Sequence, residues 1–159
     1  MFTLFVLALI YLQPVLSFNS LGIQTLFYVI LIIGHQLIAS VAQRLLTQKT
    51  HDSLAEIVHP SPLDLATIAP WADRIKHTHA YIWSGSLHYI NPLQDYPPGT
   101  CTSGFSDVRT PERTLLTAIA NYTERLADET LARWPREEAL RFLVHFIGDS
   151  EQPLHCNIH

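Results

Sequence analysis

The sequence predicts an all-α fold, and three observations support this prediction. Apolar residues recur at intervals of three and four in several segments, as they do along the buried face of an amphipathic helix. No alternating apolar and polar pattern of any length is present, nor is any internal repeat. Prolines open two of the helical segments, where they suit the first turn. With 159 residues, of which 48% are apolar, the chain is long enough for one domain with a core.

The first two predicted helices lie in the first half of the chain. One covers residues 36–46 and places apolar residues on one face at intervals of four: Leu37, Val41 and Leu45. The other covers residues 63–77 and carries a second apolar set: Ile68, Trp71 and Ile75. Because proline lacks an amide hydrogen and clashes with the preceding turn, Pro70 must bend or restart this second helix.

The third predicted helix follows a segment that is rich in proline. Residues 87–98 contain several prolines and are expected to be irregular. Thr110 and Pro111 together resemble an N-cap followed by the first helical position. The helix that they start is predicted to extend to about Arg133.

The last predicted helix opens near Pro135 and extends to Gly148. Glu137 and Glu138 are expected in its first turn, where a carboxylate interacts favourably with the helix dipole. All four predicted helices follow residue 33, so the helical domain is expected to cover residues 34–159.

The N-terminal part of the chain differs in composition from the rest. Residues 1–43 contain no Asp, Glu, Lys or Arg, whereas charged residues occur throughout the remainder. Residues 4–12 form a short apolar core, and residues 14–17 offer a plausible processing region. This arrangement resembles a secretory signal without its basic start, so residues 1–20 are predicted to be a leader outside the folded domain.

Further features bear on where the protein resides. Residues 21–33 contain a second apolar run that is too short alone to span a bilayer. Asn121 begins an Asn-Tyr-Thr glycosylation sequon, and Cys101 and Cys156 permit at most one internal disulfide. We therefore expect a secreted, extracellular glycoprotein. The alternative is a membrane-anchored protein in which residues 1–33 act together as an uncleaved anchor.

The overall charge restricts how the chain could bind an anionic substrate. Its net charge is −4, which excludes the basic footprint of a classical nucleic-acid binder. If the substrate carries phosphates, a group other than lysine and arginine must neutralise them. A bound metal cation is the obvious candidate.

The last predicted helix carries candidate metal ligands near its end. His145 and Asp149 are four residues apart, so both side chains leave the same helical face. His155 follows six residues later, beyond Pro153, where the chain must turn. Imidazole and carboxylate groups are the usual ligands of catalytic zinc, and a carboxylate can bridge two metals. Such a pair is common at helix surfaces, so the pattern alone is weak evidence.

Two more candidate ligands lie upstream. Asp73 and His88 each stand among apolar residues, in the segments WAD and LHYI. Taken singly, the two residues have structural alternatives: a capping or salt-bridged carboxylate for Asp73, and a hydrogen-bonded core histidine for His88. Burying ionisable groups is costly unless they are paired or bound to metal, so several of them together favour a metal site.

Other polar and aromatic residues are given structural interpretations. Arg74 and Lys76 flank Asp73 and are expected on a solvated helix face, with contact to a phosphate as the alternative. Trp83 and Trp134 are expected in the core rather than as platforms for stacking bases.

Four segments in order along the chain resemble signature segments of the zinc-dependent single-strand-specific nucleases. They read APWADRI, SLHYI, AIANYTERLAD and EALRFLVHFIGD, the last followed by QPLH. That family includes the mould nucleases and the plant bifunctional nucleases, with the bacterial zinc phospholipases C as distant relatives. The resemblance covers about residues 34–155 and implies a mostly helical bundle of the zinc phospholipase C and single-strand nuclease type. It also implies a cluster of three zinc ions.

The resemblance assigns roles to individual residues. It implies four ligands for the first zinc: Asp73, His88, His145 and Asp149. Asp149 would also bridge to a second zinc, which His35 shares, and His155 would bind the remaining zinc. Asp73 would in addition orient the attacking water. Tyr89 and Asn91 fall where the family stacks and hydrogen-bonds a base, and Asn91 replaces a common Asp, which would alter base preference.

The activity that the resemblance implies is hydrolysis of phosphodiester bonds in single-stranded DNA and RNA. The products would carry 5′-phosphates, and 3′-nucleotidase activity is expected beside it. The partners are therefore single-stranded nucleic acid and nucleotides, with no protein partner implied, and a membrane only if the apolar leader is retained.

The sequence departs from the family at both ends. Ile30 takes the place of a tryptophan whose amino group and carbonyl bind zinc, and the family continues well past the QPLH segment to further ligands. Cys101 matches a cysteine whose partner lies in that further region. We therefore expect a domain truncated at the C-terminal side that holds fewer than three zincs and cleaves DNA poorly. Two alternatives are a truncated non-catalytic member and a phospholipase C-like phosphodiesterase.

Overall fold

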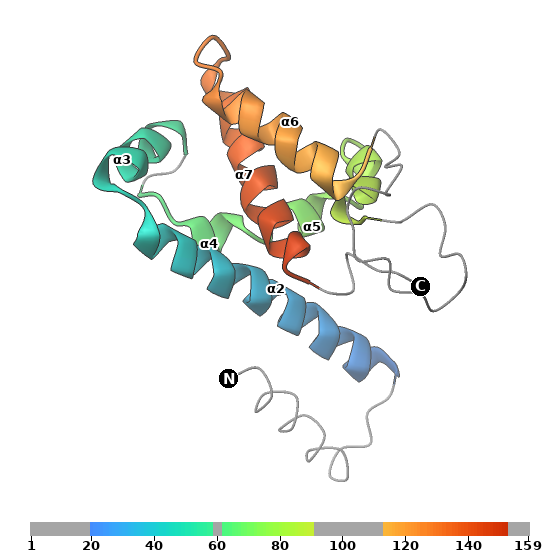
Figure 1. Cartoon of the computed structure of the whole chain (residues 1–159). Helices are drawn as coiled ribbons and strands as arrows, with labels where there is room; N and C mark the ends of the chain where they lie inside the picture. Colours follow the sequence, from blue (N-terminus) through green and yellow to red (C-terminus); the bar gives the residue numbers. More distant parts are fainter. Residues whose placement is uncertain (1–19, 59–61, 91–112, 153–159) are drawn as a thin grey trace, which may run out of the picture. The chain divides into compact units, whose positions relative to one another are not determined.

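A computed structural model describes residues 20–58, 62–90 and 113–152, and the regular elements in these ranges are all helical (Figure 1). This confirms the predicted all-α class. The chain divides into two compact units, Met1–Leu31 and Ile32–His159. Residues 1–19 of the predicted leader, together with Asn91, Cys101, His155 and Cys156, lie outside the described residues.

Helix α2 covers Ser20–Leu45, so the predicted helix at residues 36–46 is the end of a longer one. Within the Ile32–His159 unit, its buried side chains are His35 and Ala39. The face predicted from apolar periodicity, with Leu37 and Val41, is instead exposed. The helix therefore packs through Ala39, which is small, and His35, which is polar. A search for apolar periodicity does not identify such a face.

One stretch of α2, Tyr28–Leu45, is long and apolar enough to cross a membrane by length and composition. It lies near the N-terminus, and only 11% of it is buried. Signal sequences and core helices pass the same test, so this finding does not by itself distinguish a secreted protein from a membrane-anchored one.

Helix α3 covers Gln48–Ile57 and was not predicted. It begins at Thr47, whose hydroxyl accepts a hydrogen bond from the Thr50 amide at 3.2 Å. Most of its residues are polar, and it contributes Ile57 and the following Val58 to the core. A short helix with one buried edge leaves little apolar periodicity to detect.

Pro70 divides the next predicted helix in two, as expected. Helix α4 covers Leu65–Ile68 and helix α5 covers Trp71–Ile75. The side chain of Gln43 in α2 holds the start of α4, because its amide donates to the Leu63 carbonyl at 3.0 Å and its carbonyl accepts from the Leu65 amide at 2.7 Å.

A 3-10 helix, η1, covers Ile82–His88 and places His88 at its buried end. This element was not predicted. Trp83 lies on it and is 40% exposed, and Trp134 at the start of the last helix is 52% exposed. The prediction that both tryptophans belong to the core was therefore wrong.

Helix α6 covers Leu115–Ala127, with Thr114 as its N-cap. The predicted start at residues 110–111 lies outside the described residues. The helix ends six residues before the predicted Arg133. Its C-cap Asp128 accepts hydrogen bonds from the amide and hydroxyl of Thr130 at 2.9 and 2.6 Å, a local turn that competes with further helix.

Helix α7 covers Arg133–Ser150 and starts earlier than predicted, so Glu137 lies beyond its first turn. Glu137 is almost fully buried rather than placed at the helix dipole. It accepts two hydrogen bonds from Arg141, at 2.6 and 3.1 Å, one turn further along the helix. The predicted dipole role of this carboxylate was therefore wrong.

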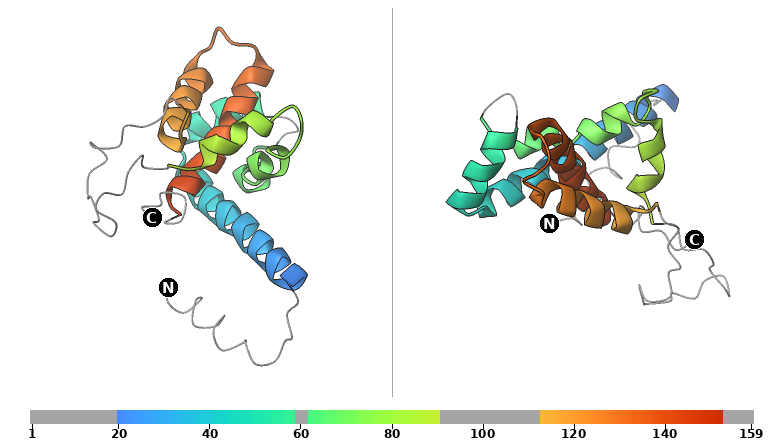
Figure 2. Two further views of the ribbon diagram at one scale, coloured as in Figure 1. Left: turned by 90° about the vertical axis from the view of Figure 1, so that its right-hand side faces the viewer. Right: turned by 90° about the horizontal axis from the view of Figure 1, so that it is seen from above.

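Helix α7 is the element around which the others pack. It contacts α3, α4, α5, η1 and α6, most extensively α6. Both views in Figure 2 show the orange α6 beside the red α7. Phe142 is fully buried on it, stacked on Tyr122 of α6 at 4.7 Å and edge-on to Trp71 of α5 at 5.1 Å. These contacts fix the orientation of α7, whose last two turns carry two of the candidate ligands, His145 and Asp149.

Candidate metal centre

The end of α7 presents two ionisable side chains to the interior. His145 and Asp149 are both fully buried, one helical turn apart. The Nε2 atom of His145 lies 3.2 Å from Oδ2 of Asp149. The helical spacing that predicted a shared face therefore produces a direct contact between the two side chains.

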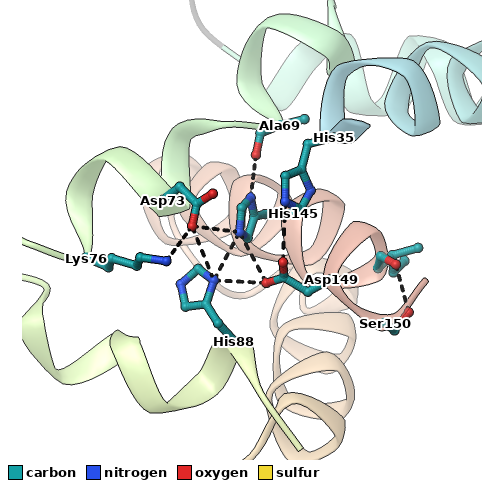
Figure 3. Close-up of polar contacts among 9 residues, drawn as sticks. His35, Ala69, Asp73, Lys76, His88, His145, Asp149 and Ser150 are labelled. Carbon is teal, nitrogen blue, oxygen red and sulfur yellow. Dashed lines mark hydrogen bonds and ion pairs between the residues drawn. The ribbon is translucent and has the colours of Figure 1, made fainter. Parts of the chain in front are cut away.

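His88 reaches the same point from the end of η1. Its Nδ1 lies 2.9 Å from Oδ2 of Asp149 and 3.0 Å from Nε2 of His145. The imidazole is fully buried. Two histidines from different elements thus meet at one carboxylate oxygen (Figure 3).

Asp73 approaches from α5 on the other side. Its Oδ1 lies 3.5 Å from Nε2 of His145 and 3.7 Å from Nδ1 of His88. The same oxygen accepts a hydrogen bond from Nζ of Lys76 at 2.6 Å. All four residues assigned to the first zinc therefore lie together, as Figure 3 shows. Lys76 is turned toward Asp73, against the prediction of a solvated helix face.

His35 joins this group from α2. Its Nε2 lies 3.3 Å from Oδ1 of Asp149, whereas Nδ1 of His88 lies 2.9 Å from Oδ2 of the same carboxylate. Its ring stacks on that of His145, with centroids 4.0 Å apart. The side chain is buried, and neither ring nitrogen has a hydrogen-bond partner within the described part of the chain. Buried nitrogens without a hydrogen-bond partner are costly for folding, which is a reason to expect that they bind a metal ion or another group.

The donor atoms form two overlapping triads that suit metal ions. One triad is His35, Asp73 and His145, and the other is His88, His145 and Asp149. In each triad the nitrogen and oxygen atoms lie within 4.8 Å of one another. Imidazole and carboxylate donors without a thiolate are the set found in catalytic zinc sites. The buried, unsatisfied nitrogens of His35 and this donor set fit a metal centre.

A backbone carbonyl sets the orientation of His145. Its Nδ1 lies 2.8 Å from the carbonyl oxygen of Ala69, the residue that follows α4, and donates to it. This hydrogen bond leaves Nε2 directed at the carboxylates. Histidine ligands of metals are commonly fixed through the second nitrogen in this way.

The electrostatics of the group favour carboxylates in their charged form. Burial disfavours the charge on Asp73, but hydrogen bonding and attraction from His145, with Lys76 beside it, hold its pKa well below the usual range. Burial also disfavours a charged His145, yet Asp149 and Asp73 raise its pKa to about 9. Burial lowers the pKa of His88, against the opposing effect of Asp149. The metal-free site thus holds a proton on His145 where a cation would bind.

The remaining predicted site residues lie at the surface or outside the described ranges. Tyr89 follows His88 directly and is 38% exposed. Asn121 is exposed on α6. Asn91 and His155 lie outside the described residues, so their assigned roles stay predictions.

The candidate ligands all lie in the part of the chain that matches a known protein family. The sequence model of the S1/P1 Nuclease family matches residues 32–159. The chain belongs to the S1/P1 nuclease family. This confirms the resemblance that the four signature segments indicated.

Individual S1/P1 family proteins align with the same part of the chain. Nuclease P1 of Penicillium citrinum is 42% identical over 124 residues, which are 77% of this chain and 46% of that protein. Endonuclease 2 of Arabidopsis thaliana is 35% identical over 135 residues, 78% of this chain and 44% of that protein. Nuclease S1 of Aspergillus oryzae is 35% identical over 124 residues, which are 77% of this chain and 42% of that protein. The chain thus matches less than half the length of these relatives.

Two features of this S1/P1 site were not found from the sequence. The Ala69 carbonyl that orients His145 leaves no signal in the residue pattern. Gly148 lies next to Asp149 in the last turn of α7, before the C-cap Glu151, and its missing side chain leaves room for His35. Glycine near a helix end usually suggests a C-cap, so its place before the C-cap Glu151 was not expected from the sequence.

Proposed function

We propose that this chain is the metal-binding part of a nuclease that hydrolyses phosphodiester bonds in single-stranded DNA and RNA. The observation that carries the proposal is the meeting of Asp73, His88, His145 and Asp149 from three separate elements at one buried point. Membership of the S1/P1 nuclease family supports a nuclease, as do relatives named nuclease P1 and Endonuclease 2. Products with 5′-phosphates and a 3′-nucleotidase activity are part of the proposal.

Zinc is the proposed metal, because the donors are imidazole and carboxylate groups. Four residues would hold a first ion: Asp73, His88, His145 and Asp149. His35 and the second oxygen of Asp149 would hold another, since they face each other at 3.3 Å. When bound, zinc lowers the pKa of water toward neutrality and offsets charge on phosphoryl oxygens.

The side chains around the ligands supply the rest of the proposed chemistry. Asp73 carries a full negative charge at neutral pH, because its pKa is strongly lowered, so it can accept a hydrogen bond from the attacking water. Lys76 donates to that carboxylate and is the cation nearest to it within the described residues, so it is placed to contact an anionic phosphate. Together they would align water and phosphate for in-line displacement.

Single-strand preference would follow from Tyr89. The ring is partly exposed beside His88, with the two ring centroids 6.4 Å apart. A base can stack on it only when the base is not paired within a duplex. Such stacking contributes about 1–3 kcal/mol per base, enough to favour single strands on a chain of net negative charge. Asn91 is the residue proposed to set base preference.

We also propose that the protein is secreted and carries a glycan on Asn121. The apolar leader of residues 1–20 and the exposure of Asn121 support this. A membrane-anchored protein is the alternative, with residues 1–33 retained.

The test is metal analysis and a nuclease assay on the same purified full-length chain. We expect bound zinc, weak cleavage of single-stranded but not duplex DNA, loss of that cleavage with a chelator, and recovery when zinc returns. His88→Ala should lose metal and cleavage, whereas the exposed His79→Ala should keep both. A chain that retains zinc but hydrolyses phosphatidylcholine instead would favour the phospholipase C alternative. Cleavage that is indifferent to the chelator would refute the proposal.

A further inference from the structure

Gly148 lies against the ring of His35 more closely than any side chain would allow. A Cβ atom added to Gly148 would overlap Nδ1 of His35 and would lie 3.0 Å from Cε1 of the same ring. Both atoms belong to the imidazole, which the backbone of α7 therefore approaches directly. Gly34 and Gly85 show no such contact: Gly85 has nothing within 4 Å, and Gly34 has only the Gln152 side chain at 3.8 Å.

The His35 ring has little freedom to make room for a side chain at position 148. It stacks on His145 at 4.0 Å, and its Nε2 lies 3.3 Å from Asp149. The residue is only 4% exposed. A Cβ at position 148 must therefore either turn the ring away from Asp149 or move α2 away from α7.

We infer that Gly148 is a positioning residue, which holds open the space through which His35 reaches Asp149 and so decides whether a second metal is bound. The inference rests on the proposed function, because it concerns a ligand of the proposed metal centre. Gly148 lies in the last turn of α7, before the C-cap Glu151, where alanine would favour helix more than glycine does, so the packing of His35 gives a reason for glycine at this position.

The first test compares the metal content of glycine-to-alanine variants of the full chain. Gly148→Ala should lose the same amount of zinc as His35→Ala, while the ligands of the first ion remain. Gly34→Ala and Gly85→Ala are matched controls and should keep the wild-type content. Gly148→Ala with wild-type zinc content would overturn the inference. A wild-type chain without zinc would instead refute the proposed function, and with it the metal part of this inference.

The second test does not depend on metal. In chelator-treated protein, Gly148→Ala should lower the melting temperature when His35 is present. In a His35→Ala background the same change should leave the melting temperature unchanged or raise it, because the clash is gone and alanine favours helix. Folding of the double variant when Gly148→Ala alone fails to fold would give the same support. An equal loss in both backgrounds would show that the added methyl meets something other than His35.

Discussion

His88 Nδ1 lies 2.9 Å from Asp149 Oδ2, although 61 positions separate the two residues in the sequence. Both side chains are fully buried, and burial lowers the pKa of His88, so its imidazole is kept neutral. A neutral imidazole beside a carboxylate is the protonation state in which both groups bind metal. Burying this pair costs folding free energy that apolar residues would not, so the contact supports the proposed metal centre rather than a role in stability.

Asp149→Asn should empty the proposed metal centre more completely than loss of any one histidine. The carboxylate of Asp149 faces His35 through Oδ1 and faces His88 and His145 through Oδ2. Asparagine keeps the shape but removes the negative charge that faces all three histidines. Mutating a residue that only supports a metal ligand typically lowers metal affinity by about 10–100-fold. Because Asp149 is a proposed ligand itself, we expect its loss to lower zinc affinity by more than about 100-fold.

Zinc titration followed by dialysis would measure the effect of Asp149→Asn. Glu151→Gln is the control, because Glu151 is exposed two residues away and should keep wild-type affinity. Wild-type zinc retention by Asp149→Asn would contradict the shared role of this carboxylate.

Lys76→Gln should separate metal binding from catalysis. The ammonium group of Lys76 donates to Asp73 at 2.6 Å and so competes with a cation for that carboxylate. Its removal should leave zinc content unchanged or higher. If Lys76 contacts the phosphate, kcat on single-stranded DNA should fall by about 100-fold, as when one transition-state donor is removed. Arg74→Gln, an exposed charge on the same helix, should have little effect on either quantity. Equal losses in both variants would indicate a general effect of charge.

Phe142→Ala should be among the most destabilising single changes in the chain. Phe142 is fully buried and packs on Tyr122 of α6 and Trp71 of α5, the helix that carries Asp73. Truncating a buried phenylalanine costs about 3–5 kcal/mol. Urea unfolding would measure it. Ile147→Ala on the same helix, 44% exposed, should cost less than about 1 kcal/mol. Similar losses in both variants would show that α7 is not the packing centre.

The sequence could predict the helices whose boundaries depend on local chemistry. Pro70 divides α4 from α5 because its missing amide acts within a single turn. Helix α3 and η1 were missed because each buries only one narrow edge. The apolar face of Leu37 and Val41 was predicted but is exposed, since α2 packs through His35 and Ala39 instead.

The candidate site could be predicted only in part from spacing. The spacing of His145 and Asp149 places them on one helical face, and the structure confirms their contact. No local rule brings Asp73 and His88 to them, because their approach depends on how α5 and η1 pack on α7. That convergence was expected from the family resemblance alone. Gly148 was missed because its role is defined by a neighbour on α2.

The stability of the metal-free chain should depend on pH through His145. Its pKa is raised from 6.5 to about 9, because the attraction of Asp149 and Asp73 outweighs the cost of burial. The charged imidazole therefore stabilises the fold fully below about pH 6.5, and this contribution is lost as pH rises through about 9. His88 and Asp73, whose pKa values are lowered, act in the opposite sense but only at lower pH.

We therefore expect the melting temperature of chelator-treated protein to fall between pH 6.5 and 9. In His145→Gln, which cannot take up the proton, this fall should be absent, whereas the exposed His79→Gln should retain it. With zinc present the trend should reverse, because the metal replaces the proton and binds more tightly as pH rises. A decline of the same size in His145→Gln and in the wild-type chain would assign the pH dependence to another group.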